Sequence, residues 1–212
     1  MSEITTPPTA RTDVRPGTPA PTVDRRPRTR AVGTGLAVTS TVFAVTMAFG
    51  GPEASDLTER IIDLTGLAFQ VGLFGLIWVM LRTAATGTGR VGRGLLHVER
   101  AVLAVASLWS VLHAVVPPAV QQAPWMVAMD MFWPLSMFGM TVVGVTVAVV
   151  GRWRGLLRWW TAAGCAWFVA SIPVAMLFPE GPGQLVGVAY MIVGFGGIGV
   201  LLAMRPGLPV RD

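Results

Sequence analysis

Residues 61–81 read IIDLTGLAFQVGLFGLIWVML, an apolar run that contains one charged side chain, Asp63. About 20 apolar residues are what an α-helix needs to cross the roughly 30 Å hydrocarbon core of a bilayer. Backbone N–H and C=O groups find no water at that depth, so such a segment must satisfy them within a helix. The run therefore predicts a transmembrane helix, and it raises the question of why that helix contains a carboxylate.

The composition of the whole chain points the same way. Of its 212 residues, 53% are hydrophobic and 13% are charged, whereas soluble domains carry about 25% charged residues. All 16 basic residues are arginine, which together with abundant Ala, Val and Gly is typical of a GC-rich genome such as that of an actinobacterium. The single cysteine, Cys165, excludes an internal disulfide and a cysteine-based zinc site. The composition thus predicts a membrane protein and identifies no activity.

Further apolar runs of similar length lie on both sides of this one, separated by short segments that contain Gly and Pro. Gly and Pro mark turns between helices. The sequence therefore predicts an all-α, polytopic membrane protein with six transmembrane helices in a compact bundle. The expected spans are residues 31–50, 61–81, 95–116, 126–150, 160–178 and 185–204, which form one domain over 31–204.

Arginine placement predicts the orientation. With six spans, one side holds the arginines of the two terminal segments and of loops 82–94 and 151–158, whereas the other side has only Arg60. Loops rich in arginine stay in the cytoplasm. We therefore expect a multi-pass plasma-membrane protein with both termini cytoplasmic.

The two ends of the chain differ from the spans. Residues 1–30 are rich in Pro, Thr and Arg, so they cannot bury enough apolar surface to offset their ordering entropy and are expected to be disordered. Their basic end is expected to contact anionic lipid headgroups rather than nucleic acid. The run 31–50 is longer than the about 7–15 apolar residues of a signal peptide, so we expect an uncleaved first helix. Residues 205–212 are expected to form a short cytoplasmic tail.

Ionisable side chains within the spans are the candidate functional residues, because each costs at least about 2.5–3.5 kcal/mol at the bilayer centre. In the predicted orientation Asp63, His113 and Asp130 come to a similar depth in the outer leaflet. Helical spacing places Asp63, Gly66 and Gln70 on one face of the second span. The third span has a face that comprises Glu99, Leu103, Ala106, Ser110 and His113.

If these faces meet, they form a polar vestibule open to the outside, made of Asp63, Gln70, Ser110, His113 and Asp130. Such a group could bind a cation, relay protons or supply acid–base catalysis. Each residue also has a structural interpretation. An acid near a helix N-terminus complements the helix dipole, and His113 could bond to a backbone carbonyl near the end of its helix.

Two prolines predict kinks. Pro134 cannot donate a hydrogen bond to the carbonyl of Asp130, four residues earlier. Pro173 predicts a second kink in the fifth span. A broken helix beside a carboxylate is a feature of ion sites in transporters, although proline is also common in membrane helices.

Three further groups are expected to serve the fold. At the cytoplasmic start of the third span, His97, Glu99 and Arg100 are interpreted as an interfacial ion cluster, with Glu99 paired to an arginine of loop 151–158. The segment GRWRGLLRWW, residues 151–160, is expected to anchor the protein at the headgroups through Trp153, Trp159 and Trp160. Small residues in the last span predict a packing seam that comprises Gly187, Gly194 and Gly197.

No motif identifies a cofactor. The chain has no phosphate-binding loop, dinucleotide fingerprint, zinc-protease motif or nucleophile elbow. His97 and His113 are 16 residues apart on one helix, about 24 Å at 1.5 Å per residue, so they cannot ligate the same haem iron. We therefore expect no cofactor and no metal.

The leading hypothesis is a non-enzymatic accessory, binding or transport-related membrane component with an outward-facing polar vestibule. The alternative is a small membrane enzyme that acts on a lipid or isoprenoid substrate, with Asp130 or Asp63 as acid and His113 as base. Six spans are few for a complete carrier, so a homo-oligomer or a larger membrane complex is a third hypothesis. The lipid bilayer is the expected partner, and nucleic acid is not.

Overall fold

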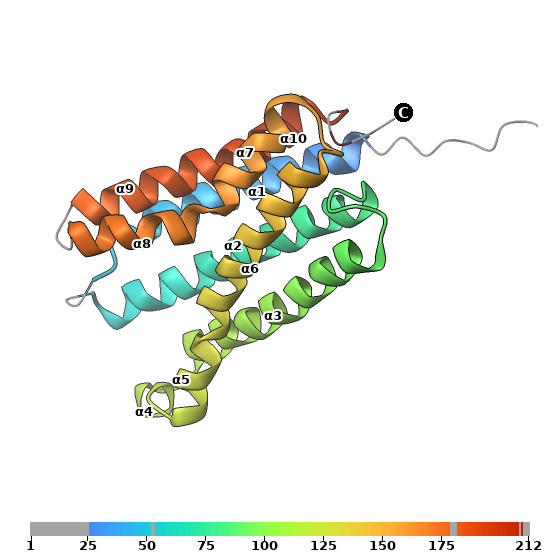
Figure 1. Cartoon of the computed structure of the whole chain (residues 1–212). Helices are drawn as coiled ribbons and strands as arrows, with labels where there is room; N and C mark the ends of the chain where they lie inside the picture. The colour runs from blue at the N-terminus through green and yellow to red at the C-terminus, as the bar shows by residue number, and fades with distance from the viewer. Residues whose placement is uncertain (1–25, 52–53, 179–181, 208, 210–212) are drawn as a thin grey trace, which may run out of the picture.

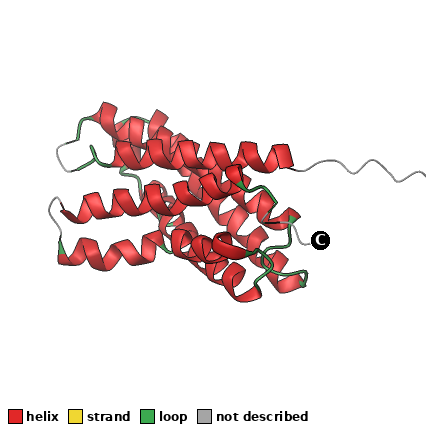
Figure 2. Cartoon of the chain, turned by 90° about the horizontal axis from the view of Figure 1, so that it is seen from above, coloured by secondary structure: helices red, strands yellow, loops and turns green. Residues whose placement is uncertain are grey.

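The computed structural model describes residues 26–51, 54–178, 182–207 and 209. Residues 1–25 of the predicted disordered tail lie outside this part, as do residues 208 and 210–212 of the C-terminal tail. Throughout the described residues the regular structure is helical (Figures 1 and 2). The elements are α1 (Arg26–Met47), α2 (Asp56–Arg82), α3 (Arg90–Val115), α4 (Pro118–Gln121), α5 (Pro124–Asp130), α6 (Phe132–Val150), α7 (Gly155–Cys165), α8 (Trp167–Leu177), α9 (Pro182–Met191), the π-helical turn η1 (Ile192–Gly196) and α10 (Gly197–Met204).

Five helical stretches in the described residues are long and apolar enough to cross a membrane by length and composition. They are Arg26–Met47, Asp56–Arg82, Arg90–Val115, Pro124–Val150 and Gly183–Met204. The predicted span 160–178 is not among them, because the chain there is divided at Ala166 into two helices of 11 residues each. The all-α fold is confirmed, and five helices of this kind indicate a membrane protein.

Most helices extend beyond the apolar runs that predicted them. α1 begins at Arg26, within the segment that was expected to be disordered. Arginine is a good helix former, and Pro27 lies in the first turn, where its missing N–H has no partner to lose. α2 begins at Asp56, and the Ser55 hydroxyl caps it by accepting a hydrogen bond from the backbone N–H of Thr58 at 3.2 Å. Apolar runs therefore locate the middles of these helices and miss their polar ends.

Most of the long helices run roughly along one direction, and α6 is inclined to them (Figure 1). α1 packs against α2 and α10, α2 against α3, and α6 against both α3 and α7. The start of α1 and the end of α10 lie at one end of the bundle, together with the connection between α2 and α3 (Figure 1). The connection between α1 and α2 lies at the opposite end. The arginine-rich and acidic helix ends are thereby separated along the length of the molecule.

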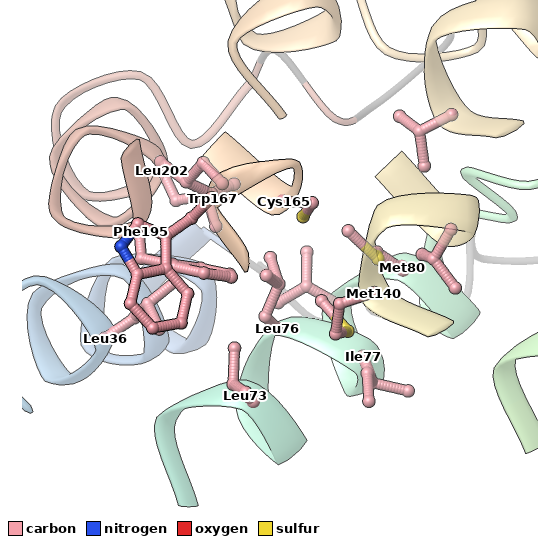
Figure 3. Close-up of a cluster of buried hydrophobic side chains, with 14 of the residues drawn as sticks. Leu36, Leu73, Leu76, Ile77, Met80, Met140, Cys165, Trp167, Phe195 and Leu202 are labelled. Atoms are coloured by element: carbon pink, nitrogen blue, oxygen red, sulfur yellow. The ribbon is translucent and has the colours of Figure 1, made fainter. Parts of the chain in front are cut away.

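The core is centred on α2, whose Leu73, Leu76, Ile77 and Met80 are fully buried. Side chains from α1, α6, α7, η1 and α10 surround them (Figure 3), namely Leu36, Met140, Cys165, Phe195 and Leu202. The outward faces of the helices are also apolar, with exposed Val, Leu, Ile and Phe side chains on nearly every helix. A soluble protein rarely exposes apolar patches of this extent, so the outer surface matches a lipid environment.

Glycines allow α1 and α10 to approach backbone to backbone. A Cβ atom added at Gly33 would lie 2.6 Å from the Ala203 nitrogen, and one at Gly199 would lie 2.5 Å from the Ala37 nitrogen. Such small-residue contacts drive helix association in lipid, where burial of apolar surface gives little gain. These two helices therefore pack without intervening side chains.

The predicted glycine seam of the last span is confirmed and faces α7 and α8. The Gly187 carbonyl accepts a hydrogen bond from the Trp167 indole at 2.7 Å. Gly194 lies against Gly164, and Gly197 lies against the Trp160 indole. In the π-helical turn the Val193 carbonyl accepts the Gly197 N–H and also the Trp160 Nε1–H, the latter at 3.1 Å.

The expected tryptophan anchor is wrong for Trp153. Its side chain is 0% exposed, and its indole N–H donates to the Thr83 hydroxyl at 2.9 Å. α6 ends at Gly151 in the left-handed conformation (φ 66°), and the following loop turns Trp153 into the core. Trp159 is 62% exposed, with the Arg158 guanidinium 4.7 Å from its ring. Trp153 is thus a core residue, whereas Trp159, in the first turns of α7, lies on the outer surface.

Replacement of Gly33 by alanine should destabilise the protein, because its Cβ would collide with the α10 backbone. We expect the free energy of unfolding in detergent micelles to fall by about 1–3 kcal/mol. Gly35→Ala is the matched control, since a Cβ at Gly35 meets no atom within 4 Å, and alanine there should leave stability unchanged or raise it by up to about 1 kcal/mol. Equal effects of the two substitutions would contradict the close α1–α10 contact.

Candidate functional site

The helix break beside Asp130 positions the site. α5 ends at Asp130 and α6 begins at Phe132, with Met131 as the junction. Pro134 lies in the first turn of α6 and cannot donate to the Asp130 carbonyl. The predicted interruption near Asp130 is therefore confirmed. α8, in contrast, continues through Pro173, and the fifth predicted span is interrupted at Ala166 instead.

Asp63 and His113 meet between α2 and α3. The Asp63 Oδ2 and His113 Nδ1 atoms are 2.8 Å apart, and the two side chains are 11% and 20% exposed. The imidazole stacks on the Trp109 indole with 4.6 Å between ring centroids. The His113 side chain thus bonds to Asp63 rather than to the backbone near its helix end. The His113 carbonyl itself accepts a bond from the Gln121 amide at 2.9 Å.

Gln70 and Ser110 form a second polar pair deeper in the bundle. The Gln70 Nε2–H donates to the Ser110 hydroxyl at 3.1 Å, and this hydroxyl donates to the Ala106 carbonyl at 3.3 Å. Gln70 is 0% exposed. Its Oε1 atom is buried without a hydrogen-bond partner within the described chain. A buried amide oxygen without a partner costs about 1–3 kcal/mol, so this atom calls for an explanation.

A cavity of about 220 Å³ joins these groups. Asp63, Gln70, Ser110 and Asp130 all line it, and α1, α2, α3, α5 and α6 contribute to its walls. His113 is not a lining residue and adjoins the cavity through Asp63. Four of the five residues predicted for the vestibule thus face one cavity, and the fifth is bonded to one of those four.

Apart from Gly66, which shares the predicted face of Asp63 and Gln70, the apolar part of the cavity wall was not anticipated from the sequence. It is formed by Phe43, Met47, Ile62, Gly66, Trp109 and Trp133. Trp109 is one turn before His113, and Trp133 is one turn after Asp130, so helical spacing from the polar residues could have found both. The Trp109 indole donates to the Met126 carbonyl at 3.1 Å, which ties α3 to α5 beside the cavity.

The chemistry of this lining is that of an acceptor site. Asp63 and Asp130 supply carboxylate oxygens, Gln70 supplies an amide oxygen, and Asp130 interacts electrostatically with both Asp63 and His113. Among the described residues no cluster of three or more His, Cys, Asp or Glu side chains could hold a metal ion. The arrangement suits a ligand with positive charge and hydrogen-bond donors.

The expected ion cluster of His97, Glu99 and Arg100 does not form. Glu99 is only 3% exposed, and it lies against Gly139 of α6. Its Oε1 accepts a hydrogen bond from the Ser136 hydroxyl at 2.6 Å, and no arginine pairs with it in the described part of the chain. His97 and Arg100 are exposed. Helical spacing explains the difference, because Glu99 shares the buried face of Leu103, Ala106 and Ser110, as the periodicity of α3 had indicated.

Comparison with protein families, curated proteins and solved structures finds no match. The chain is therefore assigned only to a broad class, the helical membrane proteins, on its fold and on its five helices of membrane-spanning length.

The bond between Asp63 and His113 should appear as a coupling energy in a double-mutant cycle. Asp63→Leu and His113→Phe remove the two polar groups, and phenylalanine keeps a ring against Trp109. We expect a coupling between about 0.6 kcal/mol, the average for interhelical bonds in membrane proteins, and about 3 kcal/mol for a charged bond. The measurement is the free energy of unfolding in mixed micelles. Asp130→Leu combined with His113→Phe is the comparison and should couple more weakly, because no hydrogen bond joins that pair in the described residues; equal couplings would contradict this geometry.

The hydrogen bond from the Ser136 hydroxyl to the buried Glu99 carboxyl should stabilise the fold. Ser136→Ala removes its donor and should lower the free energy of unfolding by about 1–3 kcal/mol, because a buried carboxyl loses its hydrogen bond. Thr146→Ala on the same helix is the control, since the Thr146 hydroxyl bonds only to the Val142 carbonyl of α6. The control should change stability by less than about 0.5 kcal/mol. A loss no larger than that of the control would show that the Ser136 bond contributes nothing.

Proposed function

We propose that this chain is a six-span plasma-membrane protein that binds a small ligand in a vestibule open to the outside, with both termini in the cytoplasm. In this proposal it is a non-enzymatic binding, accessory or transport-related component, alone or in a homo-oligomer. The observation that carries the proposal is the cavity lined by Asp63, Asp130 and the unpartnered Gln70.

The one crossing missing from the five long helices, the fifth along the chain, would be made by α7 and α8 together. They are apolar and are divided only at Ala166. A broken helix is tolerated at membrane depth when the protein satisfies the freed backbone groups. At this junction the Cys165 carbonyl accepts a hydrogen bond from the Thr141 hydroxyl at 2.9 Å, and the Ala166 carbonyl accepts one from the Ala170 N–H at 2.9 Å. These contacts are compatible with a spanning segment.

The outward orientation is supported by where charge and cavity lie. The cavity is lined by the end of α1 and the first half of α2, at the end of the bundle opposite the arginine-rich connections. Arginine-rich connections favour the cytoplasm. The cavity would therefore open toward the other side of the membrane.

Binding is favoured over catalysis by the roles of the polar groups. His113, the only histidine near the cavity, is bonded to Asp63 and does not line the cavity. The Ser110 hydroxyl donates to its own helix and accepts from Gln70. The groups that face the cavity are therefore hydrogen-bond acceptors, without a nucleophile activated by an adjacent base.

The enzyme hypothesis retains one favourable observation, the 2.8 Å contact between His113 and Asp63. An aspartate that orients a histidine is a common arrangement for general acid–base catalysis. Turnover of a lipid or isoprenoid substrate by the purified protein, lost when Asp63, His113 and Asp130 are all replaced by alanine in a folded variant, would establish this alternative and exclude the leading proposal.

Cysteine labelling tests the topology and the vestibule together. In a Cys165→Ala background, Ile62→Cys places a thiol at the cavity wall and Arg154→Cys places one in an exposed connection at the arginine-rich end. We expect a membrane-impermeant maleimide to label Ile62→Cys in intact cells, and to label Arg154→Cys only after permeabilisation. The reverse pattern would refute the orientation, and protection of Ile62→Cys from both sides would refute an open vestibule.

A further inference from the structure

On the basis of the proposed vestibule, we propose that its ligand is a small organic cation: a short alkylamine that carries a second N–H or O–H donor at its far end. The ammonium group would lie between Asp63 and Asp130, and the second donor would reach the Gln70 Oε1 atom. Three features of the cavity carry this inference, namely its charge, its unpartnered amide and its apolar walls.

The ionisable groups at the cavity are mainly acidic. Asp63 is bonded to His113, whereas Asp130 is exposed at its edge and has no hydrogen-bond or ion-pair partner in the described residues. One imidazole therefore faces two carboxylates that interact with each other. Charge-assisted hydrogen bonds between an ammonium and a carboxylate are about twice as strong as neutral ones, so a cation would be held at this position.

Gln70 supplies an independent sign of a ligand. Its side chain is fully buried and lines the cavity, and its Nε2 atom is already bonded to Ser110, but its Oε1 atom has no partner in the described chain. An amide oxygen is a hydrogen-bond acceptor, so a donor group satisfies it. A ligand with an N–H or O–H group would do so.

The carboxylates of Asp63 and Asp130 form one polar site of the cavity and Gln70 forms the other, and the two lie at different depths. Gln70 follows Asp63 by seven residues on α2, which corresponds to about 10 Å along the helix at 1.5 Å per residue. Asp130 is exposed and Gln70 is fully buried. A single compact ammonium would satisfy one of these sites, whereas a ligand with donors at both ends would satisfy both.

The walls between these sites favour an apolar linker over a bare metal ion. They include Phe43, Met47, Trp109 and Trp133. Calcium needs about six to eight oxygen ligands around one point, whereas the carboxylates and the Gln70 Oε1 atom of this lining lie at different depths. Aromatic faces attract organic cations and pack against methylene groups. The volume of about 220 Å³ is below the about 300–1,000 Å³ of drug-sized pockets, so the ligand should be short.

Three molecules of nearly equal shape test this inference. 4-Amino-1-butanol carries both end groups, pentylamine replaces its hydroxyl by a methyl group, and 1-pentanol replaces its ammonium by a methyl group. Binding of each to the purified full-length protein would be measured by titration calorimetry in detergent, with protein-free micelles as the blank. We expect 4-amino-1-butanol to bind at least about tenfold more tightly than 1-pentanol and at least about threefold more tightly than pentylamine.

Variants assign the two ends of the ligand. Asp130→Asn should weaken both amines by about tenfold or more and leave 1-pentanol unchanged. Gln70→Met, of similar volume, should weaken 4-amino-1-butanol and leave pentylamine unchanged. Asp56→Asn is the matched control, because Asp56 is an exposed acid on α2 that does not line this cavity, and it should change none of the three affinities. If Gln70→Met does not fold, the comparison of 4-amino-1-butanol with pentylamine on the unmodified protein tests the same contact.

The outcomes separate this inference from the proposed function. If 1-pentanol binds as tightly as the amines, or if Asp130→Asn has no effect, the ligand is not a cation, although the cavity still binds small molecules. If pentylamine binds as tightly as 4-amino-1-butanol, the ligand has no need of a second donor. If none of the three binds, the inference fails entirely, whereas the vestibule is judged by the labelling of Ile62→Cys.

Discussion

The structure depends on one constraint: a polar group surrounded by apolar side chains or lipid must find its partner within the protein. Serine and threonine hydroxyls donate to carbonyls of their own helices, as Ser40 and Thr161 do. Where a helix is irregular, side chains from a neighbouring helix add hydrogen bonds to its carbonyls. The Trp160 indole bonds to a carbonyl in the π-helical turn, and the Thr141 hydroxyl bonds to the carbonyl beside the break at Ala166. Against this background, the unpartnered oxygen of Gln70 is an exception.

Helical periodicity predicted much of the fold and of the site. Regular spacing placed Gln70 and Ser110 on facing surfaces, and the positions of Asp63 and His113 near corresponding helix ends brought them together. The break at Ala166 was not predicted, because no proline marks it and the Thr141 hydroxyl that bonds to the Cys165 carbonyl comes from another helix. Trp153 and Glu99 were misplaced for a related reason. Their residue types suggest an interface, but the loop after Gly151 and the contact with Ser136 place both side chains inside the bundle.

The two halves of the bundle are built differently. α1, α10, η1 and α7 meet through glycines such as Gly33, Gly199, Gly164 and Gly194, with backbone against backbone. The region around the cavity is instead packed by long or aromatic side chains, including Met47, Trp109 and Trp133. Methionine adapts its shape readily. The glycine-packed half can thus hold the helices in place while side chains at the cavity adjust.

The glycine contacts also limit how such a protein can diverge. Any codon change that replaces Gly33 or Gly199 adds a side chain where the neighbouring backbone leaves no room. Asp130 lies under no such restriction, since it is at the exposed edge of the cavity. In descendants of a common ancestor, packing alone would keep these glycines constant, whereas the exposed residues at the cavity would be kept only by selection for a bound molecule. The pattern of substitution would then distinguish selection for helix packing from selection for a bound molecule.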